Sequence, residues 1–550
     1  MRSSLLIVVL LVVMSGASIL TPAQTGSLPL VHIFEDYRSA SAFFLSMGPG
    51  ERIVVARNAS YTSDLLREMG FPAKVESYEA IPEEITPHEL AYLLLYSKEK
   101  GLQGADFGPL LKKLDLISQE LSSRESEVAV LFYSSDGPGY SLLAAYAAFL
   151  KGAKLIDLDS TQLNRELLKG VRYVILLTKP LTARNYERYL NVIDFLIGID
   201  DDPYLDASLG VLTGPDVTAP FLMLLANDAS SMGLINRLRG ISLVEDLPLA
   251  RKVEFIASSY GLSTKVLHPD VKYSNLTVKD SAKILREARN GIIYLNLHGN
   301  PYVMALKTEG NVVITPSIVR SARPLGAIVI TLSCDTLRFP DLDDPKSSIA
   351  YSFLEAGAFA YVGATRVEFS IGSEAGTSYP DLILMMVLTG HTLGEAVMTV
   401  NNLHIKEATE KGISPREAAY EVLLGDPTLS LASHQIPYVI ERSDYVYRVS
   451  ISKTTPVIYL RLQLPDEEDF LPDVEADLPS VYFKWYEDEE GLFIYVSTLS
   501  SSFTGYFRED TSVKIELRRR HGYLEYVPYL AIMLVAIISL AALVRARRVA

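Results

Sequence analysis

The sequence predicts an α/β protein with a mostly parallel sheet flanked by helices, then a small all-β domain and a single C-terminal transmembrane helix. From Val128 onward, apolar strand-like runs alternate with helical runs, which is typical of doubly wound or related parallel sheets. After Tyr438, short β-branched runs are separated by polar turns, which indicates an antiparallel β-domain. Residues 527–544 carry no charge and are long enough to span a bilayer.

The composition sets the broad class of the chain. Its 550 residues are 49% hydrophobic and 21% charged, which is ordinary for globular proteins and leaves room for about two to four domains. The formal net charge of −15 argues against a general nucleic-acid binder, because phosphate contacts need clustered lysines and arginines. The chain has one cysteine, so it cannot form an intramolecular disulfide, and its stability must come from its core.

The N-terminal end is predicted to be a secretory signal over residues 1–23. Arg2 supplies the charged start, and the run Leu5–Met14 is apolar throughout. Small residues at Ser15–Ala17 or Thr21–Ala23 offer a cleavage site. An uncleaved membrane anchor is the alternative interpretation. Under either interpretation, the bulk of the chain is expected to leave the cytoplasm.

The C-terminal end is predicted to anchor the protein in the cell membrane. Tyr523, Tyr526 and Tyr529 lie where an aromatic belt is expected at the start of the span 527–544. Three arginines follow the span, in agreement with the positive-inside rule. A buried C-terminal helix is the alternative. We expect a single-pass type I protein with a cytoplasmic tail over residues 545–550, and the sequons at Asn58 and Asn275 suit an outside face.

Between these ends, the pattern predicts two α/β units. Residues 29–123 mix short strands and helices, and form either an N-terminal domain or a pro-region. Residues 128–433 form the main domain, with two subdomains and a break near residues 200–220. The predicted strands of the main domain are 128–133, 154–158, 171–178, 221–226, 264–267 and 359–363, and its predicted helices are 139–151, 163–169, 183–195, 249–260, 279–290, 349–356 and 393–411.

Two apolar runs of the main domain end on residues that carry chemistry. The run Gly291–Asn300 reaches His298, and the run Ala327–Thr336 reaches Cys334, the only cysteine of the chain. Runs of this kind predict strands that are covered on both faces of a parallel sheet, and ligands bind at the carboxyl ends of such strands. A thiol nucleophile and its acid/base partner need this arrangement. The alternative is a small buried cysteine and an unrelated histidine, with no chemical role.

Further features follow in a fixed order along the chain. Ser333 precedes Cys334, a predicted helix leads into the run Ala360–Arg366, and the turn Gly425–Leu429 closes the domain. Together with the His298-Gly299 pair, these features resemble the gingipain-type cysteine peptidases, which share the caspase-like fold with caspases and legumains. The resemblance covers about residues 128–433, and the segment Asp202–Asp206 is similar to the family's end of the first subdomain. The sequence departs from the family pattern after the histidine: Asn300-Pro301-Tyr302 stands where the family often has a second glycine or an aromatic residue.

The resemblance implies a caspase-like sheet and a cysteine endopeptidase that acts on protein or peptide substrates and requires no cofactor. Cys334 would attack the scissile carbonyl to form a thioester, and His298 would protonate the leaving amine and later activate water. The backbone N–H groups of Gly299 and Cys334 would form the oxyanion hole. Asp228, after the predicted strand 221–226, best matches the family's carboxylate that steadies the histidine, although it also reads as a plain loop aspartate.

Acidic residues raise the question of specificity and of calcium. Asp246 lies near the position where family members that cut after Arg or Lys carry an acidic pocket residue, and it also reads as a helix N-cap. Asp341, Asp343 and Asp344 follow Cys334, where they would attract a basic substrate or hold a structural Ca²⁺. The run Asp200–Asp202 offers the same Ca²⁺ interpretation. In both runs, a solvated loop is the plainer interpretation.

The last predicted domain spans residues 438–520 and lies next to the membrane. Its strands are expected at 446–451, 457–464, 481–485, 492–496 and 512–517, which suits a sandwich of the immunoglobulin type. Such a domain would hold the catalytic unit away from the bilayer.

Two function classes remain open at this point. The first is a membrane-anchored extracellular cysteine endopeptidase, and the second is a catalytically silent caspase-like protein that binds partners at the cell surface. The position of the sole cysteine favours the enzyme. Transpeptidation shares the thioester and is not separable by sequence. His391 and His404 lack zinc-ligand spacing, and no Gly-x-Ser-x-Gly elbow is present.

Overall fold

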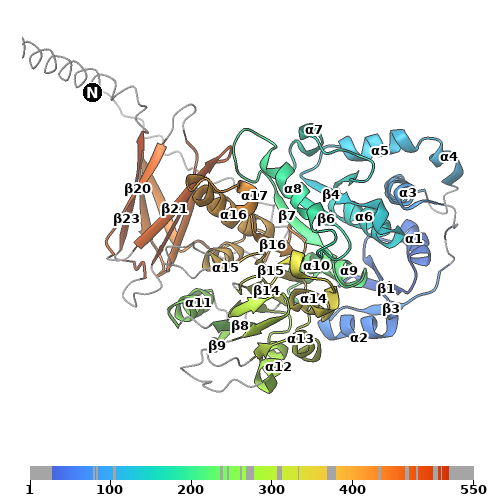
Figure 1. The fold of residues 1–550 in the computed structure, drawn as a ribbon, viewed down its shortest axis with the longest axis horizontal. Coiled ribbons are helices and arrows are strands. Elements are labelled where there is room, and N and C mark those ends of the chain that lie inside the picture. The colour runs from blue at the N-terminus through green and yellow to red at the C-terminus, as the bar shows by residue number, and fades with distance from the viewer. Residues whose placement is uncertain are drawn as a thin grey trace, which may run out of the picture.

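The computed structural model describes residues 28–519, apart from 79–80, 82–84, 103–106, 236–238, 245–246, 261–262, 268–277, 306–311, 332, 368–378, 432–434, 465–469, 479–480, 499–505 and 510. The described residues form a mixed α/β body around a ten-stranded sheet, followed by an antiparallel all-β region (Figure 1). The predicted signal at 1–23 and the predicted membrane segment at 527–544 lie outside the described residues. Within the described ranges, no helix combines the length and the apolar character needed to cross a bilayer.

The ten-stranded sheet is mostly parallel, as predicted, but its two halves run in opposite directions. The strand order is β5-β4-β6-β7-β16-β15-β14-β10-β8-β9, and among the described strands of this sheet only β16 and β15 pair antiparallel. The carboxyl ends of one half therefore lie at the opposite edge from those of the other half. One half contains β4 (Val128–Phe132), β5 (Lys154–Asp157), β6 (Tyr173–Leu177), β7 (Ser208–Leu212) and β16 (Glu421–Leu424); the other contains β8 (Arg239–Val244), β9 (Ser263–Leu267), β10 (Ile292–Asn296), β14 (Ile328–Thr331) and β15 (Ala360–Ala364).

Helices flank this sheet, which explains why its central strands are continuous apolar runs. All four residues of β14 and all five of β15 are buried, as expected for strands that are covered on both faces. The helices of this body are α6 (Pro138–Lys151), α7 (Arg165–Leu168), α8 (Glu187–Ile197), α9 (Thr218–Leu224), α10 (Ala226–Ser231), α11 (Leu247–Ser259), α12 (Val278–Glu287), α13 (Pro316–Ala322), α14 (Ile349–Glu355), α15 (Pro380–Leu388), α16 (Leu393–Glu410) and α17 (Pro415–Ala418).

One predicted strand is wrong. The apolar segment 221–226 is helical and falls within α9 and the start of α10, where Phe221 and Leu222 are buried. A short apolar run fits a buried helix as well as a buried strand, so periodicity could not separate the two structures. The strand that follows in the chain is β8, whose sequence Arg-Gly-Ile-Ser-Leu-Val is too polar to give a strong strand signal.

The N-terminal part of the chain is a small α/β unit with a parallel sheet of order β2-β1-β3. It packs into the same hydrophobic core as the ten-stranded sheet. At the β5 side, His88 Nδ1 lies 2.6 Å from Asp157 Oδ2, and the Tyr92 hydroxyl accepts a hydrogen bond from the Asp157 N–H at 3.1 Å. Its elements are β1 (Leu30–Phe34), α1 (Tyr37–Ser46), β2 (Glu51–Val55), α2 (Ala59–Met69), β3 (Ala73–Val75), α3 (Pro87–Glu99), α4 (Phe107–Leu111) and α5 (Leu114–Ser123).

The same unit also contacts the half of the sheet that carries His298 and Cys334. Glu68 of α2 forms ion pairs with Arg289 at 3.2 Å and with Arg323 at 2.9 Å. These arginines precede β10 and β14, so the contact lies at the amino ends of those strands, away from the edge where His298 and Cys334 leave the sheet. In Figure 1, the N-terminal unit accordingly lies to the right of the body, with α2 below β1 and β3.

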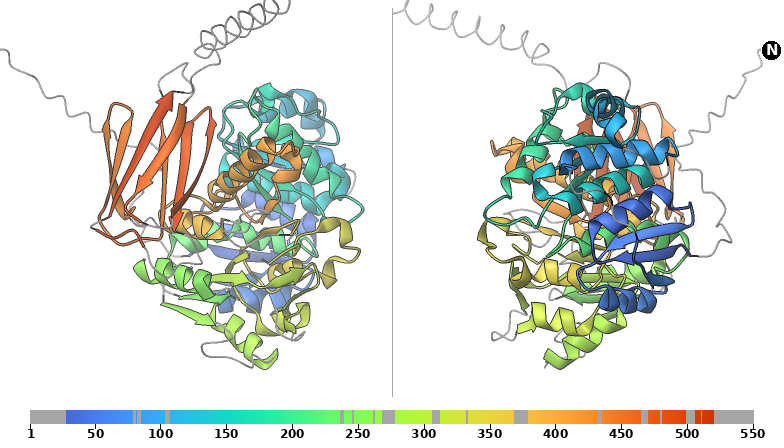
Figure 2. Two further views of the ribbon diagram at one scale, coloured as in Figure 1. Left: turned by 60° about the vertical axis from the view of Figure 1, so that its left-hand side comes forward. Right: turned by 90° about the vertical axis from the view of Figure 1, so that its right-hand side faces the viewer.

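The C-terminal β-region consists of two antiparallel sheets that share a core (Figure 2). Along β19, Ile458 and Leu460 face that core, whereas Val457 and Tyr459 pack into the core of the α/β body. The three-stranded sheet that contains β19 is therefore covered on both faces. One sheet contains β17 (Tyr438–Ser443), β18 (Val446–Ile451), β23 (Ser512–Arg519) and β20 (Phe470–Ala476), and the other contains β19 (Val457–Leu462), β22 (Gly491–Thr498) and β21 (Val481–Asp488).

Candidate active site

The loops that carry His298 and Cys334 leave the sheet at the same edge. Strands β10 and β14 are neighbours and parallel, with Leu295 opposite Thr331. His298 follows the end of β10 by two residues, and Cys334 follows the end of β14 by three. His298 is exposed, and Cys334 is half-buried and not in a disulfide. The expected arrangement at the carboxyl ends of adjacent strands is therefore present.

The two loops are in direct contact. The Leu297 N–H donates to the Ser333 hydroxyl at 3.2 Å, and both residues are buried. A Cβ atom on Gly299 would lie 2.8 Å from the Cys334 carbonyl oxygen and 2.8 Å from the Ser333 Cβ. Any side chain at position 299 would push the loops apart, so glycine is required there for the close backbone approach.

His298 is part of a small antiparallel sheet and not of the main one. β11 (His298–Asn300) pairs with β12 (Val303–Ala305), which in turn pairs with β13 (Val312–Ile314). The Asn300 side chain accepts hydrogen bonds from the N–H groups of Tyr302 and Val303, at 2.8 and 3.0 Å, and so closes the turn between β11 and β12. The three residues at which the sequence departs from the family pattern thus form a tight hairpin turn.

The Cys334 loop is fixed to the neighbouring strand by its backbone. The Asp335 N–H donates to the Arg366 carbonyl at 3.0 Å, and the Leu337 N–H donates to the Ala364 carbonyl at 2.9 Å. Asp335 adopts a φ of 56°, which is uncommon for a residue other than glycine. Burial raises the pKa of the Asp335 carboxyl, and the Arg338 guanidinium, 3.8 Å from its Oδ1, opposes this shift.

The structure does not bring Asp228 to this edge. Asp228 lies on α10, and both of its carboxylate oxygens accept hydrogen bonds from the Arg52 guanidinium at 2.7 Å. The adjacent Asn227 bonds to Asp426, which follows the carboxyl end of β16 at the opposite edge of the sheet. Asp228 is therefore paired with the N-terminal unit, and it does not orient His298. This placement follows from the helix that replaces the predicted strand 221–226.

The other predicted acidic residues have separate roles or lie outside the described residues. Asp246 is outside them. Asp341, Asp343 and Asp344 are all exposed. The Asp341 carboxylate pairs with Arg338 at 3.0 Å, and the Asp344 side chain accepts the Lys346 N–H at 3.0 Å. In the part of the chain that the structure describes, these three residues do not form a group close enough to share a metal ion.

Comparison with known proteins relates this part of the chain to a peptidase family. Residues 250–432, which include His298 and Cys334, match the model of peptidase family C25, the gingipain family. The matched residues make up about a third of the chain, and they are similar to a family of peptidases. Four chains among the solved structures also match; one of them, titled "Structure of Protease", is 13% identical, and the alignment covers 72% of this chain and 98% of that chain with a TM-score of 0.38. No curated protein matches the chain.

Sequence reasoning missed the contacts that join the loops of His298 and Cys334. The Ser333 hydroxyl and the carbonyl groups of Ala364 and Arg366 position the loop that carries Cys334. Ser333 is adjacent to Cys334 in the sequence, but its partner Leu297 lies 36 residues away, so no local pattern could show the bond. Backbone carbonyl groups leave no signal in a sequence at all.

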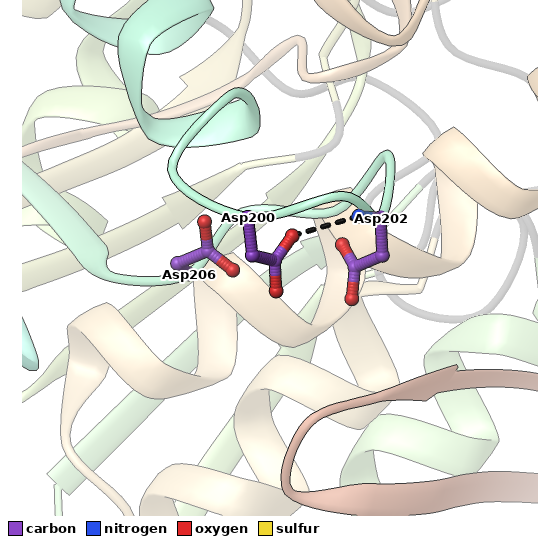
Figure 3. Close-up of side chains that lie close together, drawn as sticks. All are labelled: Asp200, Asp202 and Asp206. Atoms are coloured by element: carbon purple, nitrogen blue, oxygen red, sulfur yellow. Dashed lines mark hydrogen bonds between the residues drawn. The ribbon is translucent and has the colours of Figure 1, made fainter. Parts of the chain in front are cut away.

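Three aspartate side chains come together in the segment between α8 and β7. Asp200, Asp202 and Asp206 each place a carboxylate oxygen within 4.8 Å of the others (Figure 3). Burial raises the pKa of Asp206 to about 8, and the charges of Asp200 and Asp202 add to the shift. Burial also raises the pKa of Asp202 to about 6. Such a group can take up a proton or a divalent cation.

We expect the Asp206→Asn variant to unfold at a higher temperature than the unmodified protein at pH 8 in the presence of EDTA. The folded protein favours protonated Asp206. The ionised aspartate therefore lowers the stability progressively as the pH rises from 3.8, the ordinary pKa of the carboxyl, towards about 8, its pKa in the folded protein. The gain in unfolding temperature of the variant, about 1 °C per kcal/mol for a chain of 550 residues, should therefore shrink as the pH falls towards 4.

The matched control is Asp201→Asn, because Asp201 is fully exposed beside the cluster and should leave the unfolding temperature unchanged. Thermal unfolding at pH 4, 6 and 8 provides the measurement. A lower unfolding temperature for Asp206→Asn at pH 8 in EDTA would contradict the electrostatic argument. A repeat with added Ca²⁺ shows whether a cation replaces the proton, because Ca²⁺ would then stabilise the unmodified protein and not the variant.

Proposed function

We propose that the chain is a cysteine endopeptidase that hydrolyses peptide bonds through a thioester at Cys334, with His298 as the acid/base. The observation that carries the proposal is the meeting of two loops at one edge of the sheet: Gly299, next to His298, packs directly against the backbone of Cys334. The C25 match over the same residues supports a cysteine peptidase. The sole cysteine of the chain then occupies the nucleophile position.

The reaction follows from the chemistry of the two side chains. A free thiol has a pKa of about 8.5, and a neighbouring imidazolium favours the thiolate at neutral pH. The Cys334 thiolate attacks the scissile carbonyl carbon, and the backbone N–H groups of Gly299 and Cys334 hold the oxyanion that forms. His298 gives its proton to the amine as the C–N bond breaks, and then takes a proton from the water that cleaves the thioester.

We also propose that the substrate is a protein or peptide outside the cytoplasm, and that a basic residue precedes the cut. The signal-like residues 1–23 and the uncharged run 527–544 support secretion and a C-terminal anchor. Three exposed aspartates in the segment after Cys334, Asp341, Asp343 and Asp344, support attraction of a basic substrate. The N-terminal unit contacts the opposite edge of the sheet and shares its core, which supports a permanent domain over a removable pro-region.

Labelling with acyloxymethyl-ketone peptide probes tests these proposals together. Probes with Arg, Lys, Asn or Asp before the warhead are added to the untrimmed full-length protein, with Cys334→Ala as the control. We expect the Arg and Lys probes to label Cys334 and the variant to stay unlabelled. If iodoacetamide reacts with Cys334 while every peptide probe fails, the thiol is accessible without peptidase activity, and a silent binding protein is the better interpretation.

A further inference from the structure

The hairpin that carries His298 is tied at its turn to the segment that follows Cys334. The Pro301 carbonyl accepts a hydrogen bond from the Ile349 N–H at 2.7 Å, and the Tyr302 hydroxyl donates to the Asp341 carbonyl. Ile349 is the first residue of α14, so Pro301 satisfies one of the N–H groups that a helix leaves open at its start. Two residues of the turn thus reach the same downstream segment.

That downstream segment is itself held firmly beside Cys334. Arg338 Nε pairs with the Asp341 carboxylate at 3.0 Å, and the Arg338 N–H donates to the Asp335 carbonyl at 3.0 Å. The Leu342 carbonyl accepts the Ala183 N–H at 3.1 Å, which adds a contact with the first half of the body. The Asp341 carbonyl is therefore a fixed point relative to the nucleophile, and a bond to it fixes the hairpin in turn.

Burial of the side chain does not hold Tyr302 in position. The residue is 40% exposed, so its ring adds little to the core, and its hydroxyl donates a hydrogen bond to the Asp341 carbonyl. It lies four residues after His298, across the turn of a hairpin whose strands have only three residues each. In so short a hairpin, a bond at the turn restricts the tilt of the whole strand that carries the histidine.

We propose that Tyr302 is a positioning residue for the thiol chemistry: its hydroxyl clamps the His298 hairpin onto the Cys334 segment and keeps the imidazole in reach of the sulfur. This inference rests on the proposed function. Without the clamp, the base of the hairpin keeps the Leu297–Ser333 bond and the Gly299 contact, and the turn keeps the Pro301 bond. The imidazole then samples a wider range of positions, which weakens its effect on the thiol without changing the fold.

The test compares Tyr302→Phe with the unmodified full-length protein by the rate of Cys334 alkylation with iodoacetamide. Because the chain has one cysteine, mass spectrometry of the whole protein reports on this site alone. At pH 6.5 the reaction depends on the imidazolium, and we expect a 3- to 10-fold lower rate for the variant, about the effect of one neutral hydrogen bond. At pH 9.5 thiols ionise without help, and the two rates should agree within about twofold.

Tyr78→Phe is the matched control, because Tyr78 is 45% exposed, its hydroxyl lies 3.3 Å from the Ser46 hydroxyl, and it belongs to the N-terminal unit. It should leave both rates unchanged. Equal rates for Tyr302→Phe and the unmodified protein at pH 6.5 would overturn the clamp while the proposed function stands. A rate at pH 6.5 that does not change in His298→Ala would overturn the thiolate–imidazolium pair and the clamp with it. A loss for Tyr302→Phe of equal size at both pH values would show altered access to the thiol, and would also overturn the clamp.

Discussion

Replacement of His298 by alanine is expected to lower the rate of peptide-bond hydrolysis by about 10²–10⁴-fold, the usual contribution of a general acid/base. His298 is exposed at the end of a short hairpin, so its removal leaves no cavity in the core. The loops remain joined by the Leu297–Ser333 hydrogen bond and by the backbone contact at Gly299. The loss of rate should therefore come from the chemistry and not from unfolding.

The nature of the leaving group separates this role from a general loss of structure. An amide leaves as an amine that needs a proton, whereas an activated ester leaves without one, so His298→Ala should lose far more rate on the amide. Hydrolysis of a matched amide and ester of one peptide, each measured for the variant and the unmodified protein, gives the ratio. Cys334→Ala supplies the background, and His391→Ala is the control for loss of a half-buried histidine elsewhere. Equal losses on the amide and the ester would argue against proton donation by His298.

The local patterns of the sequence predicted most of the sheet correctly. The sequences of β4, β6, β10, β14 and β15 are continuous apolar runs because helices cover both faces of the sheet. Each strand shows this property in its own sequence, so it could be predicted locally. The antiparallel junction between β15 and β16 could not be seen in this way. Direction depends on how the chain crosses over between strands, and the short strand Glu421–Leu424 has no pattern that records it.

In the candidate site too, local sequence features could be predicted, whereas contacts between residues distant in the sequence could not. His298 and Cys334 could be paired from the sequence because each ends its own strand, and strand ends are local features. Asp228 was misplaced because its partner, Arg52, is 176 residues away and the intervening helix resembled a strand. Tyr302 gave no signal beyond its place in the departure from the family pattern, since its bond to Asp341 exists only in the folded chain.

The contact between the α/β body and the β-region contains a buried ion pair. Lys252 of α11 lies 2.6 Å from the Asp381 carboxylate of α15, with side-chain exposures of 3% and 0%. The β-region completes their bonding: Lys252 Nζ also donates to the Ser497 hydroxyl at 2.5 Å and to the Thr498 carbonyl at 3.2 Å, and the Tyr495 hydroxyl donates to Asp381. The β-region therefore supplies hydrogen-bond partners for the buried charged residues of α11 and α15.

Lys252→Met is expected to destabilise the folded chain by about 3–5 kcal/mol, because it leaves the Asp381 carboxylate buried without its counter-charge. The methionine fills a similar volume, so the loss reflects the unpaired charge and not an empty space. Urea unfolding followed by fluorescence gives the measurement, since the only tryptophan, Trp485, lies on β21 in the same sheet as Ser497. Arg67→Met, at an exposed ion pair with Asp64, should leave the midpoint nearly unchanged.

The double variant Lys252→Met with Asp381→Asn decides whether the charge is the cause. With both charges gone, the asparagine keeps an oxygen for the Tyr495 hydroxyl, and no ion remains to be desolvated. The double variant should then be more stable than Lys252→Met alone, and the two substitutions should not be additive. If the second substitution adds its full cost to the first, the lysine acts through packing, and the β-region is held to α11 and α15 by its apolar side chains alone.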